Sequence, residues 1–379
     1  MPSPQAQPSI PAARSVVVPF DPDALPSLLG RLADGVPERW RTVDRSAHAP
    51  RLVTVPGDDG TDPAGAALVT ARPHTGYLKI VDAVGDVPAV VEAVVAHARG
   101  LGLAQVKWEG WTVSPEEAAA AGFAPLRPPL TPVEDGAGPD AGHVRWLGDG
   151  GDGSDGDDSD DGPGAEPPYY GQTTHFSCGA VTALVAQAHA GTLPQEALDR
   201  EAELTLWREA TNFPSCEPVG LGVAVRRAWP SSPVTVHLDT DLPVLLGHLP
   251  EKEQEWRALL QRTSRTEAGR TGVPVDPSRL SLAAIRDAVG RGEHVLLLVS
   301  LAGMQGFDVP HWVLCHGVVP GAVVIEDPWA HAVAGDTWVD AHLLPVPDAE
   351  LDTMSVLTPE DFRGAVSLGR PQQGDTPQR

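Results

Sequence analysis

A glycine- and aspartate-rich stretch, residues 148–164, is the feature that most constrains how this 379-residue chain folds. Eight acidic residues and no basic one lie between Gly148 and Pro167. Such a segment cannot bury apolar surface and its charges repel one another, so it predicts an extended, disordered linker. The chain is also long enough for two domains. We therefore expect a first domain over 15–130, an acidic linker over 131–167, a second domain over 168–358 and a flexible tail over 359–379.

Residues 15–130 carry alternating strand and helix signals, which predict a small α/β domain. Pro88 suits the first turn of a helix and Gly100 suits its end, so a helix over 88–99 is expected. The other expected elements are strands at 15–20 and 104–108, a helix at 23–32 and a hairpin that pairs 66–72 with 76–81.

This order of elements resembles the latter half of an acetyltransferase of the GNAT superfamily. The resemblance implies that residues 82–88 correspond to the loop whose backbone N–H groups bind the coenzyme A pyrophosphate. Here that segment has one glycine, no basic residue and two acidic residues, Asp82 and Asp86, which would repel a pyrophosphate. We expect a degenerate, non-catalytic GNAT-like domain without a cofactor, which recognises a substrate or docks a partner. A generic α/β domain without GNAT ancestry is the alternative.

Cys178 begins a run of small and apolar residues, 178–186, that predicts a buried helix. Backbone N–H groups and the dipole at a helix start favour negative charge, which lowers the pKa of a thiol placed there. Gln172, six residues upstream, can direct its side-chain amide toward the backbone N–H of Cys178, and two such donors form an oxyanion hole. A buried structural cysteine beside a loop glutamine is the alternative interpretation.

Residues 309–329 predict a hairpin of two strands that meet at Pro320-Gly321. His311 would begin the first strand, and Asp327 would end the second. Because side chains alternate along strands, the two share a face only with a longer, odd-numbered loop or with a bulge. In that arrangement His311 would accept the thiol proton and Asp327 would orient the imidazole. The alternative for His311 is an ordinary interior histidine with hydrogen-bond partners.

These motifs resemble those of the bacterial C39-like cysteine peptidases, a branch of the papain-like fold. The resemblance covers about residues 168–358 and rests mainly on Gln172 with Cys178-Gly179, on Pro310-His-Trp312 and on Asp327-Pro328. It implies an α+β fold in which helices precede the sheet. It also implies four roles: nucleophile for Cys178, base for His311, orienter for Asp327 and oxyanion donor for Gln172.

Within that domain we expect helices at 194–210, 218–229, 251–262 and 282–290, and strands at 234–238 and 294–300. Trp329, two residues after Asp327, is placed where papain-like enzymes have a tryptophan that shields the polar pair. Two departures from the family pattern stand out. Ala180 replaces a proline, and a Gly- and His-rich stretch is shortened to residues 212–217, which puts the substrate cleft in doubt rather than the triad.

The resemblance implies a cysteine peptidase that cleaves a peptide through a thioester. C39 relatives cut after Gly-Gly pairs in leader peptides, so a ribosomally made natural-product precursor is the expected substrate, in a pathway with an ATP-grasp ligase. Members of the standalone type often follow an acetyltransferase-like domain, as here. The alternatives are a thioester-forming acyltransferase or amide ligase with the same triad, and a non-catalytic peptide-binding module.

Composition excludes several other classes. The formal net charge of −24 argues against nucleic acid as a partner, and no apolar run is long enough to span a membrane. Three cysteines, Cys178, Cys216 and Cys315, form no disulfide framework, and no secretory signal is visible, so a cytoplasmic location is expected. No metal site is expected, because His316 should point away from His311 and Cys315, and one Gly-Gly-x-Gly-x-Asp copy does not bind calcium.

Overall fold

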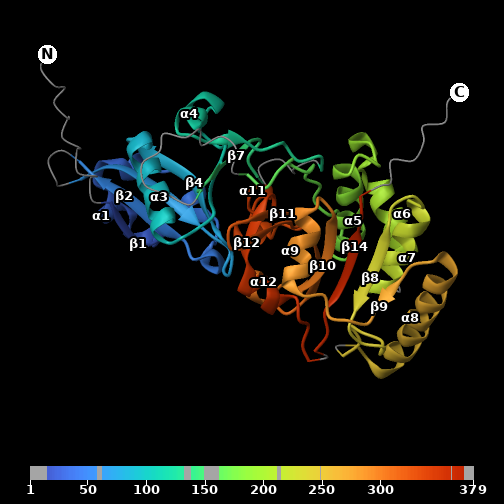
Figure 1. Cartoon of the computed structure of the whole chain (residues 1–379). Coiled ribbons are helices and arrows are strands. Elements are labelled where there is room, and N and C mark those ends of the chain that lie inside the picture. The colour runs from blue at the N-terminus through green and yellow to red at the C-terminus, as the bar shows by residue number, and fades with distance from the viewer. Residues whose placement is uncertain are drawn as a thin grey trace, which may run out of the picture.

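The computed structural model describes residues 15–57, 62–131, 138–148, 162–210, 215–247, 249–359 and 361–370. Two seven-stranded sheets organise the chain into a mixed α+β fold, as predicted. The first half of the chain builds one sheet and the second half builds the other, and the two lie side by side in Figure 1. Residues 132–137 and 149–161 of the predicted acidic linker lie outside the described residues. Across the described ranges, no helix is both long and apolar enough to cross a bilayer.

The first sheet has the strand order β1-β2-β3-β4-β5-β7-β6. Among the described strands of this sheet, only β4 and β5 are parallel neighbours, and the helix α3 (Val87–Gly100) connects them. The strands are β1 (Val16–Pro19), β2 (Arg51–Pro56), β3 (Pro63–Thr70), β4 (Tyr77–Gly85), β5 (Gln105–Glu109), β6 (Ala124–Pro125) and β7 (Gly142–Trp146). The remaining α-helices of this half are α1 (Leu25–Leu29), α2 (Arg39–Thr42) and α4 (Pro115–Ala120).

Each face of this sheet is covered by a different group of helices. The buried valines of α3 pack on one face with Val53 and Val69. On the other face, Leu25 of α1 and Trp40 of α2 pack against Leu52 and Leu68, which are the alternate residues of the same strands. The predicted hairpin of 66–72 with 76–81 is confirmed as β3 and β4, and the predicted helix over 88–99 is confirmed as α3.

The strand β7 corrects the predicted linker range. It pairs with β5 and β6 inside the first sheet, yet it falls within residues 131–167. The strand was not predicted because the range as a whole is acidic and Gly-rich, and the strand signal of Gly142-His-Val-Arg-Trp146 is only five residues long. Residues 138–148, which include β7, therefore belong to the first domain rather than to a linker.

The acidic side chains of residues 82–88 bind inside the first domain. Asp86 caps α3, because its Oδ1 accepts a hydrogen bond from the backbone N–H of Ala89 at 3.1 Å. Asp82 is buried and accepts hydrogen bonds from Arg39 and from the hydroxyl of Thr112, the latter at 2.7 Å. The start of α3 thus already carries a carboxylate at the place where the GNAT resemblance would put a phosphate.

The second domain begins with helices and continues into a sheet of order β13-β12-β11-β10-β14-β8-β9. The helices are α5 (Cys178–His189), α6 (Arg200–Ala210), α7 (Pro218–Ala228), α8 (Glu251–Thr271), α9 (Leu282–Gly290), α10 (Ala302–Gln305), α11 (Trp338–Ala341) and α12 (Asp348–Met354). The strands are β8 (Val234–Leu238), β9 (Val275–Asp276), β10 (His294–Ser300), β11 (Pro310–Val319), β12 (Ala322–Glu326), β13 (Leu344–Pro347) and β14 (Gly364–Leu368). The predicted strands 234–238 and 294–300 and the predicted helix 282–290, capped by Ser281, are confirmed.

Two hydrophobic layers enclose the second sheet. The helices α5, α6 and α7 cover one face, where Leu296 and Leu314 are buried. The helices α9 and α12 cover the other, where Val295 and Val313 are buried. Because β11 is paired on both sides, its residues are almost all buried, and side chains placed near its first residues are held firmly.

The strand β14 corrects the prediction of a flexible tail over 359–379. It lies between β10 and β8 in the sheet, with Ala365 opposite Leu297 and opposite His237. Its alternation of apolar residues is only five residues long, and the polar residues that follow it favoured a tail. Residues 371–379 lie outside the described residues.

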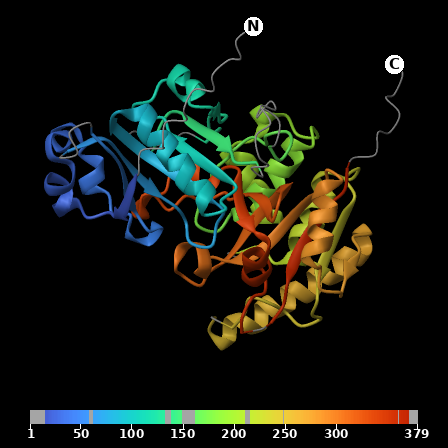
Figure 2. The same cartoon turned by 60° about the vertical axis from the view of Figure 1, so that its left-hand side comes forward.

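A buried seam joins the two domains. Apolar residues of both halves share one cluster, which includes Leu126 and Val144 from the first and Val324 and Trp338 from the second. Polar groups cross the seam as well: the backbone N–H of Gly76 donates to the carbonyl of Pro345 at 2.8 Å. In Figures 1 and 2 the blue-to-cyan first sheet lies beside the orange-to-red end of the second sheet, where Figure 1 labels β12.

Two buried lysines of the first domain reach across this seam. Lys107 on β5 donates to the carbonyl oxygens of Val339, Asp340 and His342 at 2.8, 3.1 and 2.6 Å. Lys79 on β4 forms ion pairs with the carboxylates of Glu109 and Asp340. All three donors of the Lys107 ammonium therefore have acceptors from the second domain, which fixes the docking geometry.

Replacement of Gly142 by alanine tests the tightness of the seam. A Cβ at this position would lie 2.7 Å from Val339 Cγ2 and 3.0 Å from the Trp338 ring, both in the second domain. Gly142→Ala should therefore lower the free energy of unfolding by about 1–3 kcal/mol, the usual cost of overpacking. Gly100→Ala, whose Cβ meets nothing within 4 Å, is the control and should not destabilise. Equal unfolding free energies for both variants in urea titrations would contradict the described seam.

Candidate active site

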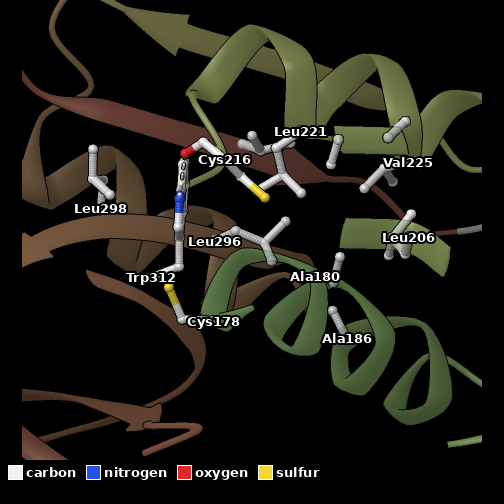
Figure 3. Packing of buried hydrophobic residues seen from close by; sticks show 14 of the residues in the cluster. Cys178, Ala180, Ala186, Leu206, Cys216, Leu221, Val225, Leu296, Leu298 and Trp312 are labelled. Atoms are coloured by element: carbon white, nitrogen blue, oxygen red, sulfur yellow. Dashed lines mark hydrogen bonds between the residues drawn. The ribbon is translucent and has the colours of Figure 1, made fainter. Parts of the chain in front are cut away.

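Cys178 is the first residue of α5, as the sequence predicts. The helix is buried on all sides from Cys178 to Ala188, so its start is fixed in place. Figure 3 shows the Cys178 sulfur beside the indole of Trp312, the residue that follows His311 on β11. The thiol of Cys178 thus lies where the helix start and the first residues of β11 meet.

Glu203 of α6 holds the loop that leads into Cys178. Its side chain is fully buried and accepts hydrogen bonds from the backbone N–H and the hydroxyl of Thr173, both at 2.8 Å. It also accepts from the hydroxyls of Ser177 and of Tyr170, the latter at 3.1 Å. Glu203 could not be predicted from the sequence, because an acidic residue on a largely polar helix carries no sign that it is buried.

A β-bulge brings His311 and Asp327 together. The turn is only two residues long, since Val319 lies opposite Ala322. Gly317 lies opposite Val324 but Cys315 lies opposite Ile325, so His316 is one extra residue on β11. This is the second of the two arrangements that the sequence analysis required for a shared face. The shift in side-chain alternation compensates for the two-residue turn.

His311 and Asp327 form a buried pair. The His311 Nε2 lies 2.8 Å from the Asp327 Oδ1, and the two side chains are 5% and 0% exposed. The same Oδ1 accepts the backbone N–H of Trp329 at 2.9 Å. The Trp329 ring lies beside the imidazole of His311, with centroids 6.4 Å apart, where the C39-like resemblance places it. The carboxylate therefore sets the orientation of the imidazole, as in a Cys-His-Asp triad.

The electrostatics of the pair favour a thiolate and an imidazolium. Burial opposes a charge on His311, but Asp327 and the Cys178 thiolate outweigh it and raise the pKa of His311 to about 10. Burial also opposes a charge on Cys178. Its charge interaction and hydrogen bond with His311, together with the backbone N–H groups of Trp312 and Gly179, nevertheless lower the pKa of the thiol. The nucleophilic form of Cys178 is thus stabilised by its partner and by the helix start.

Gln172 lies close in sequence to this site, but its side chain has a different partner. Its Nε2 donates to the carbonyl of Thr174 at 2.7 Å, and its backbone N–H donates to the carbonyl of Pro328 at 2.7 Å. The second bond ties the loop before Cys178 to the residue after Asp327. The predicted role of Gln172 as an oxyanion donor stays a prediction, and it requires the amide to turn from Thr174 toward the thiol.

Arg72 of the first domain also reaches this site, although it was not among the residues predicted from the sequence. Arg72, two residues after β3, donates from Nη1 to the Asp327 Oδ2 at 2.7 Å. The Arg72 side chain is fully buried. A single arginine in a hairpin connection carries no sequence signal that could relate it to Asp327.

The other thiols and His316 stand apart from this chemistry. Burial raises the pKa of Cys216 well above its usual value and raises that of Cys315 to about 12. His316 points to Glu326, with its Nε2 3.2 Å from the Glu326 Oε1, and not toward Cys178, as the strand pattern predicts. Within the parts of the chain that the structure describes, no group of three metal-ligating side chains is arranged to hold an ion.

Comparison with known proteins adds to this geometry. Residues 167–369, more than half of the chain, match the model of a family described as Peptidase_C39 like family. The chain belongs to this family. The matched residues of this C39-like domain include Cys178, His311 and Asp327 as well as β14, and they exclude Arg72. The family and the mixed α+β fold support a peptidase-type function.

Solved structures match the chain more weakly. A C39-like peptidase from Bacillus anthracis has 12% identity and a TM-score of 0.27, over 53% of this chain and 93% of its own. A GNAT-family acetyltransferase from Staphylococcus aureus has 6% identity and a TM-score of 0.26, over 35% and 99% of the two chains. A Bacillus subtilis acetyltransferase in complex with CoA has 15% identity and a TM-score of 0.23, and the match covers 35% of this chain and 97% of that one. Structural similarity at TM-scores this low does not indicate a shared activity. No curated protein matched the chain.

The three thiols of this C39-like protein should react at very different rates. Iodoacetamide attacks thiolates, so Cys178, with its lowered thiol pKa, should be alkylated at neutral pH well before Cys216 and Cys315. Peptide mapping by mass spectrometry after timed labelling measures the three rates. His311→Ala should slow the labelling of Cys178, because the thiolate loses its charged partner. Labelling of Cys315 before Cys178 would show that the thiol at the helix start is not activated.

Proposed function

We propose that this protein is a cysteine peptidase in which Cys178, His311 and Asp327 form the catalytic triad. The observation that carries the proposal is the buried pair of His311 and Asp327, 2.8 Å apart and hydrogen-bonded to a thiol of lowered pKa. Membership of the C39-like family supports the same chemistry. A thiol at a helix start, a base within reach and a carboxylate that orients the base are the parts that nucleophilic catalysis requires.

The first half of the reaction forms a thioester. The Cys178 thiolate attacks the carbonyl carbon of the scissile amide, and the carbonyl oxygen takes the negative charge. The His311 imidazolium then gives its proton to the departing amine as the C–N bond breaks. Asp327 stays ionised throughout and stabilises the imidazolium. The products of this step are a free amine and an acyl group on the Cys178 sulfur.

The second half releases the acyl group. Neutral His311 accepts a proton from a water molecule, the hydroxide oxygen attacks the thioester carbonyl, and the C–S bond breaks to restore the Cys178 thiolate. The product is a carboxylic acid, which loses its proton to solvent, and His311 regains its charge. An amine in place of water would give acyl transfer by the same steps, so product analysis with and without an acceptor amine separates the two reactions.

Two donors are proposed for the oxyanion that forms in both halves. The backbone N–H of Cys178 belongs to the first turn of α5, whose amides have no acceptor within the helix. Gln172 supplies the second donor once its amide leaves the carbonyl of Thr174. Hydrogen bonds of this kind often tighten only when substrate is bound.

The proposed substrate is a peptide, and the first one to test is a precursor with a Gly-Gly pair at the end of its leader. The C39 resemblance supports this choice, and it also points to a pathway that contains an ATP-grasp ligase. The proposed role of the first domain is to bind the leader rather than to transfer an acetyl group, because Asp86 already caps the helix start at which the phosphates of coenzyme A would bind.

Substitution of the triad tests the proposal directly. With fluorescence-quenched peptides that contain a Gly-Gly pair, Cys178→Ala and His311→Ala should abolish cleavage, and Asp327→Asn should be milder than either. Gln172→Ala should cost about 10²–10³ in rate, the range for one oxyanion donor. Because the Cys178 side chain is buried in the core of the second domain, Cys178→Ala should lower the free energy of unfolding by about 1 kcal/mol, and melting temperatures show that the inactive variant is still folded. Cys315→Ala is the matched control and should retain activity.

The cleavage assay also has results that would reject the triad. Full activity of Cys178→Ala would end the proposal, whatever the effect of the other variants. An inactive His316→Ala beside an active His311→Ala would move the base to the other side of the strand and contradict the role of the bulge.

The pH dependence gives an independent check. The imidazolium of His311 must protonate the leaving amine, so kcat should fall as the pH rises through the pKa of His311, about 10. Because the charge of Asp327 raises that pKa, Asp327→Asn should move the alkaline limb to lower pH. Stopped-flow measurement of kcat from pH 6 to pH 11 records the limb, with Cys315→Ala as control. An unchanged limb in Asp327→Asn would separate Asp327 from His311.

A further inference from the structure

One hydrogen-bond partner of the Asp327 carboxylate comes from the first domain. Arg72 lies in the connection between β3 and β4, and 255 residues separate it from Asp327. Its Nη1 donates to the Asp327 Oδ2 at 2.7 Å, its Nη2 donates to the carbonyl of Trp329 at 3.1 Å, and its Nε donates to the Asp336 Oδ2 at 3.1 Å. The guanidinium thus binds three points of the segment that follows β12.

The two oxygens of the Asp327 carboxylate have separate partners. Oδ1 accepts from His311 and from the backbone N–H of Trp329, whereas Oδ2 accepts from Arg72. A carboxylate held only at Oδ1 could rotate about its last side-chain bond, because terminal torsions of this kind are broad. The bond to Arg72 removes that freedom, so it fixes the plane in which Oδ1 meets the imidazole.

Arg72 is itself held firmly. Burial opposes its charge, but Asp336 and Asp327 outweigh this effect and raise the pKa of Arg72 further above its usual value. Asp336 is buried and also accepts from the Gln305 side chain at 2.9 Å and from the backbone N–H of His331 at 3.1 Å. The His331 ring stacks on Trp329 with centroids 5.2 Å apart, so one cation anchors both Asp327 and the aromatic residues beside His311.

We propose that Arg72 is a positioning residue for the triad, so that the peptidase site of the second domain is complete only when the first domain is docked. This inference rests on the proposed peptidase function. The first domain then has a role in the chemistry besides any binding of the leader. Arg72 touches neither the thiol nor the scissile bond, and it acts only through Asp327.

Lys79 provides the comparison that separates this role from simple domain adhesion. Like Arg72, it is a buried cation of the first domain that pairs with carboxylates near the seam, those of Asp340 and Glu109. Its ion pairs are thus with carboxylates other than that of Asp327. A substitution that merely loosens the seam should therefore act alike at Lys79 and Arg72, and only a positioning role should distinguish Arg72.

The test compares Arg72→Met with Lys79→Met in the full chain, using the quenched Gly-Gly peptides. Arg72→Met should lower kcat on the order of 10²-fold, the cost of a small misplacement of a catalytic group, with KM changed far less. Lys79→Met should keep kcat within severalfold of the parent. Melting temperatures of both variants show how much each loosens the fold.

The acid limb of the pH profile is a second readout. The titratable and charged groups around Asp327 are His311 on β11 and Arg72 from the first domain. Tyr169, before α5, and Asp336, after β12, lie further out. Burial favours the neutral form of Asp327, whereas His311 and then Arg72 lower its pKa. Loss of Arg72 should let Asp327 take up a proton at higher pH, which moves the acid limb of kcat/KM upward. Lys79→Met should leave that limb in place.

Chemical rescue gives a third readout. Millimolar guanidinium should restore part of kcat to Arg72→Ala, whose cavity has the shape and the acceptors of the lost group, and it should not help Lys79→Ala. If Arg72→Met does not fold, Arg72→Lys keeps the charge but loses the forked donors, and it should show the same loss of kcat.

The outcomes distinguish this inference from the proposed function. If Cys178→Ala still cleaves, the peptidase proposal itself fails. If Cys178 is essential but Arg72→Met matches Lys79→Met in kcat, in acid limb and in its lack of rescue, then Arg72 only joins the domains and the positioning role is wrong. A selective loss of kcat with guanidinium rescue supports it.

Discussion

A row of alternating charges, Arg72, Asp327, His311 and Cys178, is the interaction on which the rest of the structure depends. All four side chains are almost completely buried, and an unpaired charge in such a place costs several kcal/mol. Each group therefore needs its neighbour: Arg72 neutralises Asp327, Asp327 supports the imidazolium, and the imidazolium supports the thiolate. The row also crosses the boundary between the two sheets, so the docking of the domains and the charge state of the thiol are parts of one electrostatic arrangement.

The framework around this row explains why it stays in place. Glu203 ties the loop before Cys178 to α6, and the backbone of Gln172 ties the same loop to Pro328. The bulge at His316 sets the face on which His311 lies, and Asp336 holds Arg72 from behind. These contacts come from segments that are far apart in the chain, and each restrains one member of the row.

Local signals in the sequence account for much of this site. A small, apolar run after Cys178 predicts the start of α5, and alternating apolar residues predict the hairpin of β11 and β12, both confirmed. The sequence could predict only that His311 and Asp327 share a face if the hairpin has a longer loop or a bulge. It could not predict the bulge itself, because one extra residue in a strand leaves no mark in composition. Arg72 and Glu203 could not be predicted, since their partners lie on other elements and only the packed fold brings them together. The strands β7 and β14 were missed because acidic or polar flanks outweighed five-residue patterns.

The scarcity of lysine gives the seam between the domains an unusual consequence. The chain has three lysines, of which Lys79 and Lys107 are buried at the seam and Lys252 is exposed on α8. Of the three lysines, an acylating reagent for amines should thus modify Lys252, while Lys79 and Lys107 stay shielded as long as the domains remain docked. The acylation rates of Lys79 and Lys107 therefore report how often the two domains separate, and they can be measured in the natural protein without an introduced label.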